Sequence, residues 1–151
     1  GTGHLGKIHA RIYAQCKDAE LIGICDTDLD KAKIHAQSFS TTAYADYKQL
    51  LDKADAVSIA TPTSAHFKIA SDFLKHKVHV MVEKPITKKI SEAEKLIELA
   101  KKNKRILQVG HVERFNPAIK TLSRFCKNPL AAPAYLGRRA RKRDKNVCPL
   151  S

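Results

Sequence analysis

The sequence has no run of about 18 apolar residues and no charged start followed by an apolar segment, so nothing in it marks a membrane span or an export signal. Its four cysteines lie far apart and form no C-x-x-C pair, which argues against a zinc site and against a disulfide framework. We expect no metal site, and we expect a reducing cytoplasm as the location of the protein.

Acidic residues are scarce compared with basic ones: 15 Asp and Glu stand against 28 Lys and Arg, for a formal net charge of +13. Such a balance raises the possibility of a polyanionic partner. Much of the excess, however, lies on or beside one amphipathic segment at 88–105 and is typical of the solvated face of a helix. The one dense basic cluster, RRARKR at 138–143, has no interleaved aromatic side chains on which bases could stack. Nucleic acid is therefore not the favoured partner.

The sequence does have the composition of a folded protein, with 43% apolar and 28% charged residues. Its 151 residues suffice for one domain with a small appendage. Strand-like and helix-like segments alternate: helices are predicted at 5–16, 27–39, 46–52, 64–77 and 91–104, and strands at 20–25, 56–62, 78–85 and 105–110. This alternation predicts an α/β fold with a doubly wound, mostly parallel, Rossmann-type sheet.

Two helix starts are marked by polar residues. Thr27 or Asp28 is expected to cap the helix at 27–39. Ser91 is expected to cap the helix at 91–104, with Glu94 as its capping-box partner.

The chain opens with GTGHLGKIHA, a G-x-G-x-x-G pattern that leads directly into a predicted helix. Gly1 would allow a tight turn, Gly3 a close approach of the backbone to a phosphate, and Gly6 close packing of the helix on a strand. The amides at the start of that helix can hold a pyrophosphate. A dinucleotide would therefore lie against the turn residues, which are Gly1, Gly3, His4, Leu5 and Gly6.

Asp26 ends the next predicted strand, 20 residues after Gly6. A carboxylate at this place accepts hydrogen bonds from the adenosine ribose hydroxyls, and it repels a 2′-phosphate. No arginine follows Asp26 directly to form a phosphate clamp. The pattern thus predicts an NAD site, with NADP less favoured.

The glycine motif normally follows a buried strand, yet no residue precedes Gly1. That strand is central to a sheet of this kind, so without it the sheet has an unpaired slot. We therefore expect the first strand of the sheet to be missing from the chain.

The motifs GTGHLGKIHA, DTD, ATPTSAH, EKP and GHVERFNPA, in this order, resemble the family of glucose-fructose oxidoreductase, inositol dehydrogenase and MocA, which are NAD(P)-dependent sugar oxidoreductases. The GHVERFNPA stretch is most similar to members that act on nucleotide-linked sugars. The resemblance implies an enzyme that transfers a hydride between nicotinamide and a sugar or sugar-nucleotide hydroxyl carbon. It also implies a small-molecule sugar substrate, no membrane partner, and a homo-oligomer at full length.

The resemblance implies roles for individual residues as well. Lys84 of EKP would be catalytic, because its ammonium group can position and polarise the reacting hydroxyl. The cofactor would also contact Glu83, at its nicotinamide end, and Thr61, Pro62 and His66. Arg114 and Asn116 would reach toward nicotinamide or substrate.

The residues alone leave other interpretations open for four of these positions. A lysine after a strand, such as Lys84, is usually a solvated charge, and His66 could cap a helix. Arg114 could brace a structural carboxylate, and Asn116 before a proline is typical of a turn.

The resemblance divides the chain into a dinucleotide-binding domain at 1–128 and the beginning of a second, α+β domain at 129–151. The D-x-x-x-H segment of the family's second domain does not occur in the sequence. We therefore expect this piece alone to bind the cofactor without catalysing the reaction. Two alternatives remain open: a non-catalytic NAD-binding module, and a basic nucleic-acid-associated protein.

Overall fold

The structure, a computed structural model, describes residues 1–119 and 121. The chain divides into two compact units, Gly1–His111 and Val112–Ser151. The predicted second-domain segment at 129–151 and the basic cluster at 138–143 lie outside the described residues. No helix in the described part of the chain is both long enough and apolar enough to cross a membrane.

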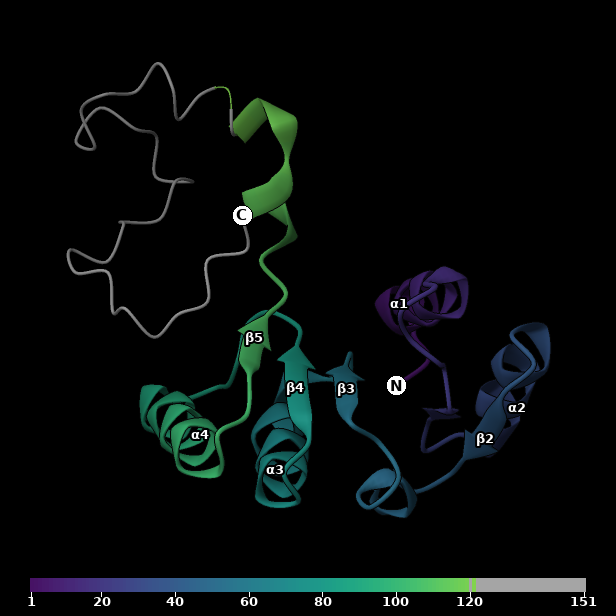
Figure 1. Ribbon diagram of the computed structural model, residues 1–151, viewed down its shortest axis with the longest axis horizontal. Helices are drawn as coiled ribbons and strands as arrows, with labels where there is room; N and C mark the ends of the chain where they lie inside the picture. The colour runs from purple at the N-terminus through teal and green to yellow at the C-terminus, as the bar shows by residue number, and fades with distance from the viewer. Residues whose placement is uncertain (120, 122–151) are drawn as a thin grey trace. The chain divides into compact units, whose positions relative to one another are not determined.

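The first unit alternates strands and helices and contains two parallel sheets (Figure 1). Its helices are α1 (His4–Gln15), α2 (Leu29–Ser38), α3 (Thr63–Lys75) and α4 (Ile90–Asn103), with a 3-10 helix η1 at Tyr47–Leu50. Its strands are β1 (Gly23–Cys25), β2 (Thr42–Tyr44), β3 (Ala56–Ile59), β4 (His79–Val82) and β5 (Leu107–Val109). The sheets have the orders β1-β2 and β3-β4-β5. These elements confirm the predicted parallel α/β fold, and β2 is the strand that the sequence pattern did not predict.

The helix starts agree only partly with the expected caps. Asp28 caps α2, since its Oδ1 accepts a hydrogen bond from the Lys31 amide at 3.2 Å. The capping box expected at Ser91 is wrong, because α4 begins at Ile90 with Lys89 as its N-cap residue. The Lys89 carbonyl already accepts from the amides of Glu92 and Ala93, so the first turn closes before Ser91.

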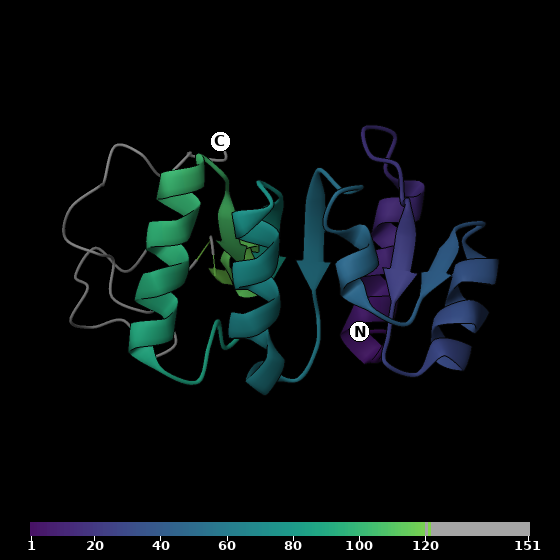
Figure 2. The same cartoon turned by 90° about the horizontal axis from the view of Figure 1, so that it is seen from below.

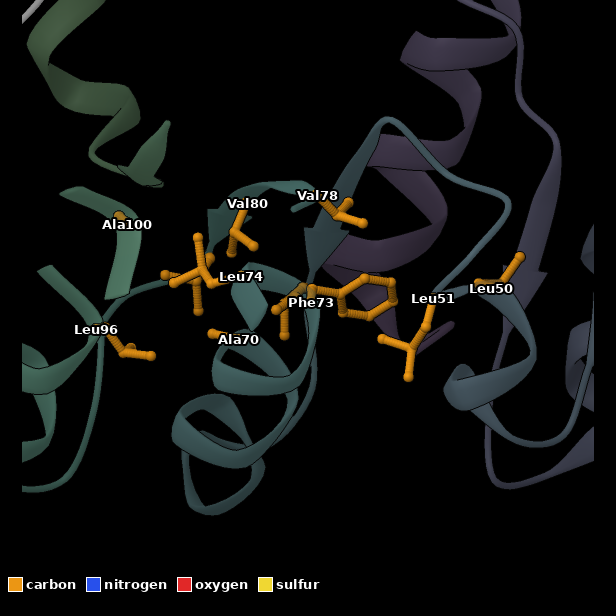
Figure 3. Close-up of a cluster of buried hydrophobic side chains, with 11 residues drawn as sticks. Leu50, Leu51, Ala70, Phe73, Leu74, Val78, Val80, Leu96 and Ala100 are labelled. Atoms are coloured by element: carbon orange, nitrogen blue, oxygen red, sulfur yellow. The ribbon is translucent and has the colours of Figure 1, made fainter. Parts of the chain in front are cut away.

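The hydrophobic core lies between the β3-β4-β5 sheet and helices α3 and α4 (Figure 3). Figures 1 and 2 show these two helices side by side along the sheet. Eleven buried side chains form the core: Leu50, Leu51, Ile59, Ala70, Phe73, Leu74, Val78, Val80, Val82, Leu96 and Ala100. Burying a large apolar side chain contributes about 1.5–3 kcal/mol, so this cluster fixes β3 and β4, the strands that lead to the candidate site.

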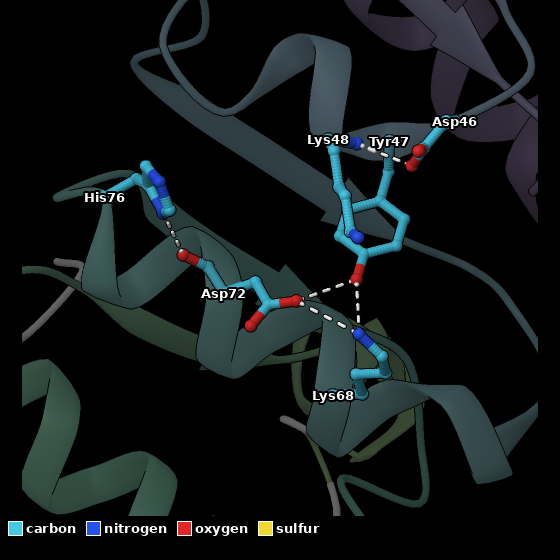
Figure 4. A network of polar contacts seen from close by, with 6 residues as sticks. All are labelled: Asp46, Tyr47, Lys48, Lys68, Asp72 and His76. Carbon is cyan, nitrogen blue, oxygen red and sulfur yellow. Dashed lines mark hydrogen bonds and ion pairs between the residues drawn. The ribbon is translucent and has the colours of Figure 1, made fainter.

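A polar network joins η1 to α3 at the edge of the core (Figure 4). The Tyr47 hydroxyl donates to Asp72 Oδ2 at 2.7 Å and accepts from Lys68 Nζ at 3.2 Å, while its ring packs on Phe73. Burial and the hydrogen bond to Asp72 raise the pKa of Tyr47. The hydroxyl holds the chain segment that leads to β3 through its bonds to Asp72 and Lys68.

Candidate functional site

The glycine turn at the start of α1 is closely packed at two of its glycines and open at the third. A Cβ on Gly6 would lie 1.8 Å from the Gly1 carbonyl oxygen, and one on Gly1 would lie 2.7 Å from the Ala60 carbonyl oxygen. A Cβ on Gly3, the N-cap residue of α1, would have no atom within 4 Å. The space beside Gly3 therefore lies at the start of a helix, where the backbone amides and the helix dipole favour an anion.

His4 and Leu5 follow in the first turn of α1, and both are exposed. No acidic side chain lies in that turn to compete with a bound anion for its amides.

Asp26 is bound directly to the glycine turn. Its Oδ2 accepts hydrogen bonds from the Thr2 amide at 2.6 Å and from the Thr2 hydroxyl at 2.8 Å. Its Oδ1 accepts from the Asp28 amide at 3.0 Å. Sequence reasoning identified Asp26 but missed Thr2, a buried residue between two of the motif's glycines. The turn and the end of β1 thus form one structure.

The carboxyl group of Asp26 is strongly acidic in this setting. Partial burial favours the neutral form, but the hydrogen bonds from Asp28 and Thr2 outweigh it and lower the pKa of Asp26 from 3.8 to about 2. The group is therefore an anion at neutral pH and an acceptor for hydroxyl donors.

The low pKa of Asp26 makes the stability of the protein depend on pH in acid. The charged carboxylate stabilises the fold at pH values above 3.8, and this contribution is lost as the pH falls toward 2. We expect Asp26→Asn to lower the free energy of unfolding at neutral pH, with the difference from the unaltered protein shrinking across that acidic range. Urea titrations of both proteins at several pH values measure this difference in the free energy of unfolding. The exposed Asp30, whose Oδ1 lies 3.5 Å from Lys33 Nζ, provides the matched control Asp30→Asn. A deficit of Asp26→Asn that persists at pH 2 would contradict the assignment.

Thr61 and Pro62 form the loop between β3 and α3, and His66 lies in the first turns of α3. His66 is only 1% exposed, with Nδ1 2.9 Å from the Pro85 carbonyl oxygen and Nε2 2.9 Å from the Thr61 carbonyl oxygen. Its ring joins the loop after β3 to the loop after β4, so it does not cap the helix.

Glu83 and Lys84 follow β4 and face in different directions. Lys84 is exposed, whereas Glu83 is 6% exposed and its carboxylate points inward. Glu83 Oε1 lies 3.2 Å from His9 Nε2 on α1, and its Oε2 accepts from the Lys84 amide at 3.2 Å. Gly110 leaves room for this carboxylate, because a Cβ there would lie 2.7 Å from Oε1.

Arg114 and Asn116 belong to the second unit, in and just after the 3-10 helix η2 (Val112–Phe115). Arg114 is exposed. Asn116 donates from Nδ2 to Glu113 at 2.8 Å and accepts from the Ala118 amide at 3.0 Å. These contacts are those of a turn residue.

Within the first unit, the predicted site residues meet at the carboxyl ends of β1, β3 and β4. Thr2 links the glycine turn to Asp26, Gly1 packs on the loop after β3, and His66 links that loop to the one after β4. This is the edge at which open parallel sheets bind ligands. Among residues 1–119 and 121, no group of three or more His, Cys, Asp or Glu side chains is placed to hold a metal ion.

Two named proteins illustrate the sequence similarity. The chain is 38% identical over 136 residues to UDP-N-acetylglucosamine 3-dehydrogenase of Acidithiobacillus ferrooxidans, an alignment that covers 90% of this chain and 42% of the relative. It is 30% identical over 131 residues to myo-inositol 2-dehydrogenase of Thermotoga maritima, covering 85% of this chain and 39% of the relative. The chain thus spans about two fifths of the length of these relatives.

Solved structures agree with the sequence comparison. The Acidithiobacillus ferrooxidans dehydrogenase matches with a TM-score of 0.78 over 83% of this chain and 41% of that one, at 38% identity. Scyllo-inositol dehydrogenase from Lactobacillus casei, with bound NAD(H) and scyllo-inositol, matches with a TM-score of 0.76 at 25% identity, over 83% of this chain and 38% of that one.

The family comparison covers most of the chain. Residues 1–111 match the family described as "Oxidoreductase family, NAD-binding Rossmann fold". With the glycine turn, Asp26 and the parallel sheets in place, the chain belongs to this family of glucose-fructose oxidoreductase, inositol dehydrogenase and MocA.

Proposed function

We propose that the chain forms the cofactor-binding part of an NAD-dependent dehydrogenase that transfers a hydride between nicotinamide and a hydroxyl-bearing carbon of a sugar or sugar-nucleotide. The observation that carries the proposal is the attachment of the glycine turn to Asp26 through Thr2. It sets an anion-binding helix start and a hydroxyl-binding carboxylate side by side, as a dinucleotide requires. The relatives named for sugar-nucleotide and inositol substrates support the substrate class.

The residues present fit an NAD molecule. The open space at Gly3 accommodates a pyrophosphate against the amides of α1. Asp26 keeps acceptor capacity beyond its bonds to Thr2 and Asp28, because an ionised carboxylate has about four lone-pair sites. Its charge disfavours a 2′-phosphate, so NAD is preferred over NADP.

Lys84 is the proposed catalytic residue. It is exposed at the end of β4, while its backbone is held by the bond from its amide to Glu83. Its ammonium group can donate to the reacting hydroxyl and stabilise the alkoxide that develops there. Bound NAD supplies the hydride acceptor.

Other residues support the cofactor and the substrate. Thr61 and Pro62 line the cofactor directly, and His66 acts by holding their loop. Arg114 and Asn116 are proposed to reach toward nicotinamide or substrate. We propose further that the enzyme is a homo-oligomer and that it is located in the cytoplasm.

Titration of the protein with NADH, followed by fluorescence or calorimetry, tests the cofactor site. We expect binding that Asp26→Ala weakens by about tenfold or more, because hydrogen bonds to a charged group are worth about 1.5–3 kcal/mol. The same change is expected to reduce the preference for NADH over NADPH. Asp30→Ala, at an exposed carboxylate on α2, serves as the control. Equal NADH affinity in the Asp26 variant and the unaltered protein would reject the ribose role.

A further inference from the structure

We propose that His9 is a positioning residue for Lys84, acting through Glu83. The proposal rests on the function proposed above. It concerns a polar contact between α1, the helix that begins at the glycine turn, and the segment after β4.

His9 has polar partners on both of its ring nitrogens. Nε2 lies 3.2 Å from Glu83 Oε1, and Nδ1 lies 2.7 Å from the hydroxyl oxygen of Ser58 on β3. The side chains of His9 and Glu83 are 13% and 7% exposed. A ring with its proton on Nε2 satisfies both contacts, since it donates to the carboxylate and accepts from the hydroxyl. Ser58 thus orients the ring that holds Glu83.

Glu83, held by His9, in turn restrains the backbone of Lys84. Its second oxygen accepts from the Lys84 amide at 3.2 Å, and its carboxylate lies against the place where Gly110 has no side chain. The Glu83 amide is fixed as well, donating to the Ile59 carbonyl at 2.9 Å. The carboxylate therefore has little room to shift unless the Lys84 backbone shifts with it.

His9 lies one turn along α1 from Gly6, where the helix packs on the Gly1 backbone. The same rigid helix thus presents its first amides to the pyrophosphate and holds the segment that bears Lys84. In this way His9 sets the distance between the cofactor and the ammonium group. A misplacement of about 1 Å at a reacting group can cost roughly 100-fold in rate.

The test uses the full-length protein, NAD⁺, and whichever of UDP-N-acetylglucosamine and myo-inositol the unaltered protein oxidises. We expect His9→Ala to lower kcat by about 10- to 100-fold, with the Kd of NADH changed less than about threefold. With substrate deuterated at the reacting carbon, the kinetic isotope effect on kcat is expected to rise. Loss of folded enzyme alone would leave that isotope effect unchanged. His9→Gln, whose amide can donate to Glu83, is expected to recover most of the rate.

A matched control is His76→Gln, at an exposed histidine at the end of α3. If His9→Ala does not fold, Glu83→Gln carries the isotope measurement, because it replaces the carboxylate that contacts both His9 and the Lys84 amide. Turnover and isotope effect in His9→Ala, or in Glu83→Gln in its place, equal to those of the unaltered protein would overturn the positioning role alone. An unaltered protein that neither binds NADH nor oxidises either substrate would overturn the proposed function, and this inference with it.

Discussion

Replacing Lys84 by alanine is expected to lower kcat by about 10²- to 10³-fold, the usual cost of removing one donor that stabilises developing negative charge. Lys84 is exposed, and within the described residues its side chain makes no hydrogen bond or ion pair. Its amide donates to Glu83 Oε2. The free energy of unfolding and the Kd of NADH should therefore stay close to those of the unaltered protein. Steady-state kinetics with an NADH titration measure both effects.

A control for Lys84 lies four residues along the chain. Lys88 is also exposed, and Lys88→Ala is expected to leave kcat unchanged. Lys84→Arg keeps the positive charge but changes its shape, so it should recover only part of the rate. Unaltered turnover in Lys84→Ala would remove this residue from the catalytic list.

Alanine at Gly6 is expected to disrupt both the fold and NADH binding. In an ordinary helix interior this change stabilises by about 1 kcal/mol. Here the new Cβ would lie 1.8 Å from the Gly1 carbonyl oxygen, so the turn must move away from α1. We expect the free energy of unfolding to fall by about 1–3 kcal/mol or more, and NADH binding to be lost. Denaturant unfolding and an NADH titration measure the two effects.

Replacing Gly3 by alanine tests the role of the turn in binding the pyrophosphate separately from its role in the stability of the fold. Its Cβ would meet no atom within 4 Å, so the free energy of unfolding should change by less than about 1 kcal/mol. The methyl group would nevertheless occupy the space assigned to the pyrophosphate, and we expect the Kd of NADH to rise at least tenfold. Full NADH affinity in Gly3→Ala would mean that the pyrophosphate does not lie at this turn.

The order of strands and helices could be predicted from apolar periodicity, but β2 could not. Its three residues, Thr42–Tyr44, have exposed and half-buried side chains and, among the described strands, pair with β1 alone. They therefore lack the apolar run that marked the other strands. The cap of α4 was misplaced for a similar reason. Backbone bonds from the Lys89 carbonyl decide where that helix begins, and no side-chain motif reports them.

The positions of candidate site residues could be predicted where a motif carries them: Asp26 lies against the glycine turn, and Lys84 lies exposed just after β4. Their roles stay predictions. Thr2, His9 and Ser58 were missed because their contacts join residues 24 to 74 positions apart, and no local pattern encodes such pairs. The directions in which the side chains of Glu83 and His66 point could not be predicted from the sequence either. A strand end places a residue at the edge of the sheet, but packing against α1 and Pro85 turns these two side chains inward.

The bonds between Thr2 and Asp26 bear on the thermodynamics of cofactor binding. They order the turn while the chain folds, so its conformational entropy is lost at that stage and not when the dinucleotide arrives. A preorganised receptor of this kind converts more of its contact energy into affinity. Association should then resemble rigid docking, with little loop rearrangement slowing the encounter.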